Sequence, residues 1–165
     1  MSTFRICGRY PWYVAPSRLG VCFRPPLTHL DFWQSPTHFD KIASPLLSQL
    51  TLAALHADSV EQYLIPAIVE LANAVQASED HAKSVNAKLL AHMRDEDIHV
   101  RLAAVEALTQ VYAKVGEEWL SLLPESVPVI AELMEDDEDV ESATQRLIKA
   151  IEEHLGEGEL ESMLV

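Results

Sequence analysis

With 165 residues and a formal net charge of −14, the chain has the length of one domain and a strongly acidic balance. Nearly half of its residues are apolar and few are aromatic, which is typical of a globular, helical protein. No apolar run is long enough to cross a bilayer, and we expect no secretory signal. Cys7 and Cys22 do not form a disulfide framework, so a reducing intracellular compartment is expected.

The charge is divided unevenly along the chain. Residues 1–37 contain four arginines and the single acid Asp31, a net charge of +3, which leaves −17 for residues 38–165. A surface that acidic repels phosphate, so direct nucleic-acid binding by the second part is disfavoured. Basic protein segments are the expected partners.

Residues 1–37 combine closely spaced prolines with aromatic and basic side chains, and no helical or strand period persists in them. Because proline removes a backbone donor and disfavours helix in the preceding residue, no continuous helix is predicted. We predict a largely disordered leader. The functional alternative is a basic, aromatic arm that docks on a partner or on RNA.

The chain then becomes helical in pattern. Ser59 and Gln62 are spaced as a capping box, which predicts a helix over residues 60–76 with Tyr63 in its apolar stripe. Pro66 inside this helix predicts either a kink or the true first turn. Before it, apolar residues recur at steps of three and four: Phe39, Ile42, Leu46, Leu47, Leu50 and Leu55.

Four further helices are predicted. Ser78 can begin one that ends near Met93, and Asp97 can cap another over residues 98–115, with Gly116 after its end. The next helix lies between residues 119 and 135, and Pro124 and Pro128 either interrupt it or start it. A last helix is predicted over residues 139–155, followed by a flexible tail over residues 157–165.

Two stretches about 40 residues apart repeat one another. Residues 93–100 align with residues 134–140 after a single gap, and the apolar positions that follow coincide. Residues 65–71 and 127–133 are also close copies. Helical hairpins of the HEAT type have this period, and each buries its apolar faces only by stacking on its neighbours. The sequence therefore predicts an all-α, HEAT-like solenoid of about three hairpins over residues 38–156.

Asp95 and Arg101 resemble a recurrent feature of HEAT repeats, in which an aspartate in the turn and an arginine six residues later bond to neighbouring units. The resemblance implies an inter-repeat structural pair. The alternative is that Arg101 binds a partner's carboxylate. The last repeat has Glu141 where the arginine would fall, so this ladder is expected to end there.

A closer resemblance covers residues 40–165. The string from Leu122 to Asp136, with its Leu-Leu-Pro-Glu-Ser start, is similar to the C-terminal end of the family of HEAT repeat-containing protein 1 and U3 small nucleolar RNA-associated protein 10. Leu89, Leu90, Arg94, Asp95 and the Val-Arg pair at 100–101 resemble the preceding repeat of that family, whereas residues 1–37 show none of its motifs.

This resemblance implies a non-enzymatic scaffold of the small-subunit processome, in the nucleus and nucleolus. Such a scaffold would support pre-rRNA processing for 18S rRNA and transcription by RNA polymerase I. Its partners would be other processome proteins of the early pre-rRNA-binding subcomplex and, indirectly, U3 snoRNA and pre-rRNA, with no membrane and no small-molecule substrate. A generic HEAT or armadillo adaptor for transport or phosphatase regulation is the alternative.

Other candidate sites favour binding over catalysis. The run Glu135, Asp136, Asp137, Glu138 and Asp139 lacks the mid-loop glycine and ligand spacing of a calcium loop, so it predicts an acidic turn that can bind a basic partner. His81, His92, His99 and His154 show no metal-ligand spacing. No nucleophile elbow or phosphate loop occurs, so we expect no cofactor, no metal and no catalytic site. A hydrolase that uses a carboxylate cluster is the least favoured of the possible functions. Trp119 is expected to pack between hairpins, with an exposed docking anchor as the alternative.

Overall fold

The computed structural model describes residues 36–156 and residue 160, and the predicted leader lies outside these residues except for its last two positions. Helices fill most of residues 36–156, and no strand occurs among them. None of the helices in this part of the chain is both long enough and apolar enough to cross a membrane.

The first hairpin pairs one regular helix with a longer second arm whose winding changes along its length. The regular helix starts at Pro36, two residues before the predicted domain boundary. The second arm follows directly, and the helical backbone bends within it at His56, whose φ of −140° and ψ of 52° are non-helical. The elements in chain order are α2 (Pro36–Ser48), the 3₁₀ turn η1 (Gln49–Leu52), α3 (Ala53–Ser59), the π-helical turn η2 (Val60–Leu64) and α4 (Ile65–Val75).

The second and third hairpins follow the predicted repeat. Each has a first helix, a tight acidic turn and an 18-residue second helix. The elements are α5 (Glu79–His92) and α6 (Ile98–Val115), then the 3₁₀ segment η3 (Gly116–Leu122), α7 (Leu123–Leu133) and α8 (Glu138–Leu155).

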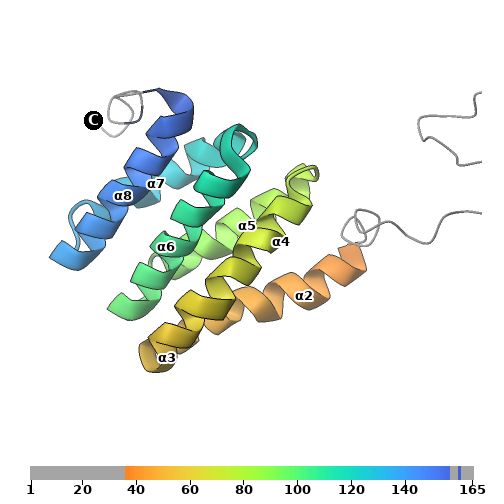
Figure 1. The fold of residues 1–165 in the computed structure, drawn as a ribbon, viewed down its shortest axis with the longest axis horizontal. Helices are drawn as coiled ribbons and strands as arrows, with labels where there is room; N and C mark the ends of the chain where they lie inside the picture. Colours follow the sequence, from red (N-terminus) through yellow and green to blue (C-terminus); the bar gives the residue numbers. More distant parts are fainter. Residues whose placement is uncertain (1–35, 157–159, 161–165) are drawn as a thin grey trace, which may run out of the picture.

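The three hairpins stack side by side in two layers (Figure 1). The second helices form one layer, in which α6 lies between α4 and α8, and the first helices α2, α5 and α7 form the other. One apolar core runs between the layers from Phe39 in α2 to Ile151 in α8. The chain therefore adopts the all-α, HEAT-like solenoid that the repeat predicts, because each helix buries its apolar stripe against the next hairpin.

Several predicted helix ends are confirmed. Asp97 caps α6, since its Oδ1 accepts a hydrogen bond of 2.8 Å from the backbone N–H of His99. Gly116 ends that helix with a φ of +69°, a backbone conformation that residues other than glycine rarely adopt. Ser78 begins α5 from an extended conformation, although its side chain makes no capping hydrogen bond.

The predicted capping box at Ser59 is wrong. Ser59 has helical backbone angles, and the chain continues from α3 through η2 into α4 without a break. The irregular turn lies next to Pro66, which occupies the first turn of α4. Because proline cannot donate to the carbonyl four residues earlier, the turn widens, and Ile65 N–H bonds to the carbonyl of Val60. Pro66 therefore marks the start of α4, one of its two predicted roles.

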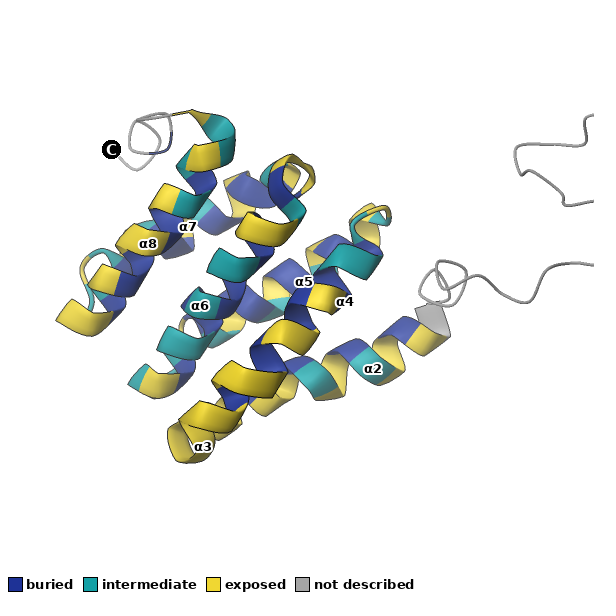
Figure 2. Cartoon of the chain, viewed as in Figure 1, coloured by how far each residue is buried: buried dark blue, intermediate teal, exposed yellow. Residues whose placement is uncertain are grey.

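Two residues assigned to apolar stripes are exposed instead. Leu55 is 78% exposed and Tyr63 is 68% exposed, and Figure 2 shows that the outer side of α3 is largely open to solvent. The first hairpin has a neighbouring hairpin on only one side, which leaves the apolar residues on its other side uncovered. Periodicity places residues on a face of a helix, but it does not say whether a neighbour covers that face.

The predicted flexible tail does not apply to Leu160, which is fully buried in the core cluster. The other residues of 157–165 lie outside the described part of the chain. Trp119 is also buried, at 1% exposure, which confirms packing in the core over a docking anchor.

Candidate interaction surfaces

Arg101 joins the turns of the second and third hairpins. Its Nη1 donates to the backbone carbonyls of Asp95 and Glu96, at 3.0 and 3.1 Å. Its Nη2 donates to Asp136 Oδ1 and Asp137 Oδ2, both at 3.0 Å. Nε lies 2.9 Å from Asp136 Oδ2, an ion-pair contact that lacks the angle of a hydrogen bond. With only 13% of its side chain exposed, Arg101 acts inside the stack.

The predicted pair of Asp95 and Arg101 thus has a different geometry from a direct carboxylate–guanidinium contact. Arg101 contacts the carbonyl of Asp95, whereas the Asp95 carboxylate accepts from the backbone N–H of Asp97 at 3.0 Å and holds its own turn. The carboxylates that Arg101 meets belong to the following repeat. At the equivalent position of that repeat, Glu141 accepts a hydrogen bond from Gln145, one turn along the same helix.

A buried polar pair that sequence reasoning missed links α5 to α7. Asn86 Nδ2 donates to Ser126 Oγ at 3.4 Å, and Ser126 Oγ donates in turn to the carbonyl of Leu122 at 3.3 Å. Both side chains are fully buried. They lie 40 residues apart, about one period of the repeat, so small polar residues in the apolar stripes of two successive first helices were the available signal.

Exposed ion pairs also connect neighbouring hairpins. Arg94 forms a bidentate pair with Glu132, with both distances 2.6 Å, and this contact holds the pKa of the Glu132 carboxyl below its ordinary value. Two weaker contacts join the second-helix layer: Lys114 to Glu70 at 3.7 Å and Arg146 to Glu106 at 4.0 Å. Each surface pair stabilises little by itself, so these contacts set the register of the stack more than its stability.

The acidic run at residues 135–139 divides into two parts. Asp136 and Asp137 face Arg101, as described above, and are partly neutralised within the stack. Glu135, Glu138 and Asp139 are exposed at the turn and the start of α8, where the helix dipole favours negative charge. The surface offered to a partner is therefore smaller than the sequence suggests.

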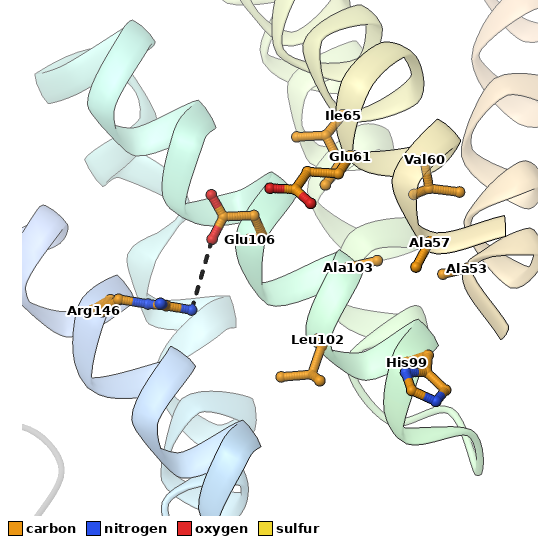
Figure 3. Close-up of a pocket in the computed structure, with 10 residues that line it drawn as sticks. All are labelled: Ala53, Ala57, Val60, Glu61, Ile65, His99, Leu102, Ala103, Glu106 and Arg146. Atoms are coloured by element: carbon orange, nitrogen blue, oxygen red, sulfur yellow. Dashed lines mark ion pairs between the residues drawn. The ribbon is translucent and has the colours of Figure 1, made fainter.

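A shallow groove of about 410 Å³ crosses the layer of second helices (Figure 3). Its floor holds small residues such as Ala57 and Ala103. Figure 3 shows that the side chain of Glu61 from η2 extends toward α6, whereas Glu106 from α6 turns its carboxylate toward Arg146 of α8, 4.0 Å away. The exposed carboxylate of Glu61 can accept a basic side chain at this groove.

The histidines do not form a metal site among the described residues, where no group of three or more metal-ligating side chains gathers. His81 is half-buried near the start of α5. It stacks on Phe39 with ring centroids 4.2 Å apart and so joins α5 to α2.

Residues 62–153 match the family described as the Vacuolar 14 Fab1-binding region, so the chain carries a domain of that family. Comparison with individual proteins identifies a narrower family than this domain match does. A protein of Schizosaccharomyces pombe named U3 small nucleolar RNA-associated protein 10 is 48% identical over 130 residues, which cover 78% of this chain and 8% of that protein. The chain belongs to the U3 small nucleolar RNA-associated protein 10 family.

Other members of this family give the same result. The protein of the same name from Chaetomium globosum is 45% identical over 154 residues, which cover 93% of this chain and 9% of that protein. That alignment extends into residues 1–37, where no family motif is recognisable from the sequence. The Neurospora crassa protein is 46% identical over 81% of this chain and 7% of its own length. The chain thus spans less than a tenth of the relatives it matches.

Proposed function

We propose that this chain acts as a non-enzymatic scaffold of the U3 small nucleolar ribonucleoprotein within the small-subunit processome, in the nucleolus. The observation that carries the proposal is its identity of 42–48% to proteins named U3 small nucleolar RNA-associated protein 10, over most of its length. The finer role is support of pre-rRNA processing for 18S rRNA and of transcription by RNA polymerase I.

The geometry supports a binding role. Three stacked hairpins with one continuous core form a rigid array, and stacked repeats of this kind offer long surfaces to other proteins. Contacts of Arg101, Asn86 and Arg94 fix the second hairpin against the third. The stacking of His81 on Phe39 joins the second hairpin to the first, so side chains on different hairpins keep a constant spacing. A partner that spans two hairpins would therefore meet preorganised contacts.

Charge supports indirect association with RNA. The acidic surface repels the phosphate backbone, so contact with U3 snoRNA and pre-rRNA would pass through basic processome proteins. We infer two docking places for basic segments: the exposed acids Glu135, Glu138 and Asp139, and the groove at Glu61. Binding there is expected to weaken as salt rises, because screening acts on exposed charges.

Affinity purification of the tagged chain from cells tests the proposal. The expected result is enrichment of U3 snoRNA and processome proteins over an unrelated small nucleolar RNA. Recovery of import receptors or phosphatase subunits without U3 snoRNA would instead favour a generic HEAT adaptor.

A matched pair of variants tests the acidic docking place. The triple change Glu135→Gln, Glu138→Gln and Asp139→Asn should reduce recovery of partners. A control with the same change in charge removes three exposed acids elsewhere, by Glu117→Gln, Glu118→Gln and Glu153→Gln, and should retain recovery. Equal loss in both variants would mean that net charge, and not this turn, governs the association.

A further inference from the structure

The outer side of the first hairpin is apolar and uncovered. Leu52, Leu55 and Tyr63 are 44%, 78% and 68% exposed, and they are the exposed large apolar side chains of the described residues. All three lie within twelve consecutive positions, from η1 to η2. The opposite end of the stack is different, because α8 presents polar side chains such as Gln145 and Lys149 there. An apolar cluster at one end of a stack marks a contact surface.

The cluster borders a groove of about 460 Å³ between the end of α2 and the second arm of the hairpin. Its apolar lining includes Leu46, Leu52, Tyr63 and Leu64. His56, which also lines the groove, has non-helical backbone angles that bend α3 at this place. The groove is open and mainly apolar, which suits a chain segment with large apolar side chains.

We propose that residues 1–35 of this same chain occupy the groove and cover Leu52, Leu55 and Tyr63. Their composition fits the surface: they hold seven of the eleven aromatic residues of the chain. Their prolines restrict the backbone, which lowers the entropy lost on docking.

Charge is complementary as well. Residues 1–35 carry four arginines and one aspartate, whereas the first hairpin carries four acids and one lysine. Two of these acids, Asp58 and Glu61, flank Ser59 and Val60 of the groove wall. The attraction of +3 for −3 across the contact favours this segment over a second copy of the acidic body, which would be repelled.

The segment is long enough to reach. It joins α2 at Pro36, and the groove begins about ten residues later, at Leu46, a rise of about 15 Å along the helix. Cys22 precedes Pro36 by 14 residues, which span up to about 45 Å when extended. The segment can therefore return antiparallel to α2 and lie over the groove.

The two native cysteines provide the test, because Cys7 and Cys22 both lie in the segment and the rest of the chain has none. The intact chain is labelled with a benzophenone maleimide and irradiated at low concentration, and the cross-linked peptides are identified by mass spectrometry. The expected products are intramolecular and join Cys22 to peptides within residues 46–67. Cross-links spread evenly over the body would overturn the proposal, and so would intermolecular ones at the groove, which would indicate a second copy.

Variants separate a specific contact from chance collisions of a tethered label. Leu55→Ser with Tyr63→Ser should lower the ratio of docked to free segment about tenfold or more. Gln145→Ser with Lys149→Ser, at the opposite end of the stack, should leave the cross-links unchanged. Circular dichroism checks that each variant is folded, which is expected because all four side chains are exposed. Equal yields in the two variants would contradict docking in the groove.

A second experiment uses the chain without the benzophenone label, so that the apolar label itself cannot cause the docking. Arg18→Glu with Arg24→Glu should release the segment and raise the fluorescence of an apolar dye such as anilinonaphthalene sulfonate. Adding Leu55→Ser and Tyr63→Ser to that variant should remove the increase. Dye fluorescence that does not change on charge reversal would count against the proposal.

Discussion

Replacing Arg101 by alanine is expected to lower the stability of the whole stack. The guanidinium is 13% exposed and Asp136 is 22% exposed, so the variant leaves a largely buried carboxylate without its cation. It also leaves the carbonyls of Asp95 and Glu96 without a donor from this side chain. Asp137, at 63% exposure, contributes little because water screens it.

The magnitude follows from these contacts. Two hydrogen bonds from a charged donor to carbonyls and one partly buried ion pair together suggest a loss of about 2–4 kcal/mol in the free energy of unfolding. For a domain of this size, that corresponds to a melting temperature lower by about 10 °C. Thermal denaturation followed by circular dichroism at 222 nm measures it.

Arg94→Ala is the matched control. Arg94 also bridges two hairpins, but half of its side chain is exposed and so is its partner Glu132, so its removal should cost less than about 1 kcal/mol. A double-mutant cycle between Arg101→Ala and Asp136→Ala should show a coupling of about 1–3 kcal/mol. If Arg101→Ala and Arg94→Ala have the same small effect, or the cycle shows no coupling, the ladder role of Arg101 is refuted.

Three further predictions concern the core. Leu108→Asp puts a charge into a fully buried position of α6, so it should lower the free energy of unfolding by more than about 4 kcal/mol and abolish helicity. The control Ala113→Asp, on the exposed side of the same helix, should remain folded. Retained helicity in Leu108→Asp would show that the core face is misassigned. Burial raises the pKa of Tyr112 to about 12, while contact with the Ser126 hydroxyl opposes this. Because the tyrosine of the unfolded chain loses its proton first, the stability due to this group is complete below about pH 10 and is lost as the pH rises to about 12, a loss of about 2–3 kcal/mol. Denaturant titrations across this pH range should show that Tyr112→Phe lacks the loss. Equal pH dependence of the variant and the original chain would contradict this prediction. Gly116→Ala should destabilise the fold by about 1–2 kcal/mol, because the φ of Gly116 is +69° and a Cβ there would lie 3.3 Å from His154 Cε1. If its denaturation midpoint equals that of the control Glu117→Ala, position 116 does not strain an alanine.

The sequence predicts the fold well where repetition constrains it. Residues 93–100 and 134–140 repeat the same turn, so the stacking of the second and third hairpins follows from the pattern. Asp97 and Gly116 mark helix ends by local backbone chemistry, which needs no tertiary information.

The first hairpin shows where prediction from sequence ends. Ser59 with Gln62 has the spacing of a capping box, but the stripe that continues through Val60 and Leu64 packs on the core and keeps the chain helical. Tyr63 has the period of a core residue and yet is exposed, because burial depends on which neighbour lies opposite.

The contacts between hairpins were only partly predictable. The spacing of Asp95 and Arg101 indicates a polar ladder, but the partners in the next repeat follow from three-dimensional stacking. Asn86 and Ser126 are single polar residues in apolar stripes, and only their separation by one repeat connects them.

Localisation of the tagged chain in living cells tests the central claim most directly. If the chain is a scaffold of the U3 ribonucleoprotein, it should accumulate in nucleoli together with a marker of pre-rRNA processing. Accumulation at the vacuolar membrane, or an even distribution through the cell while the chain remains folded, would contradict the account.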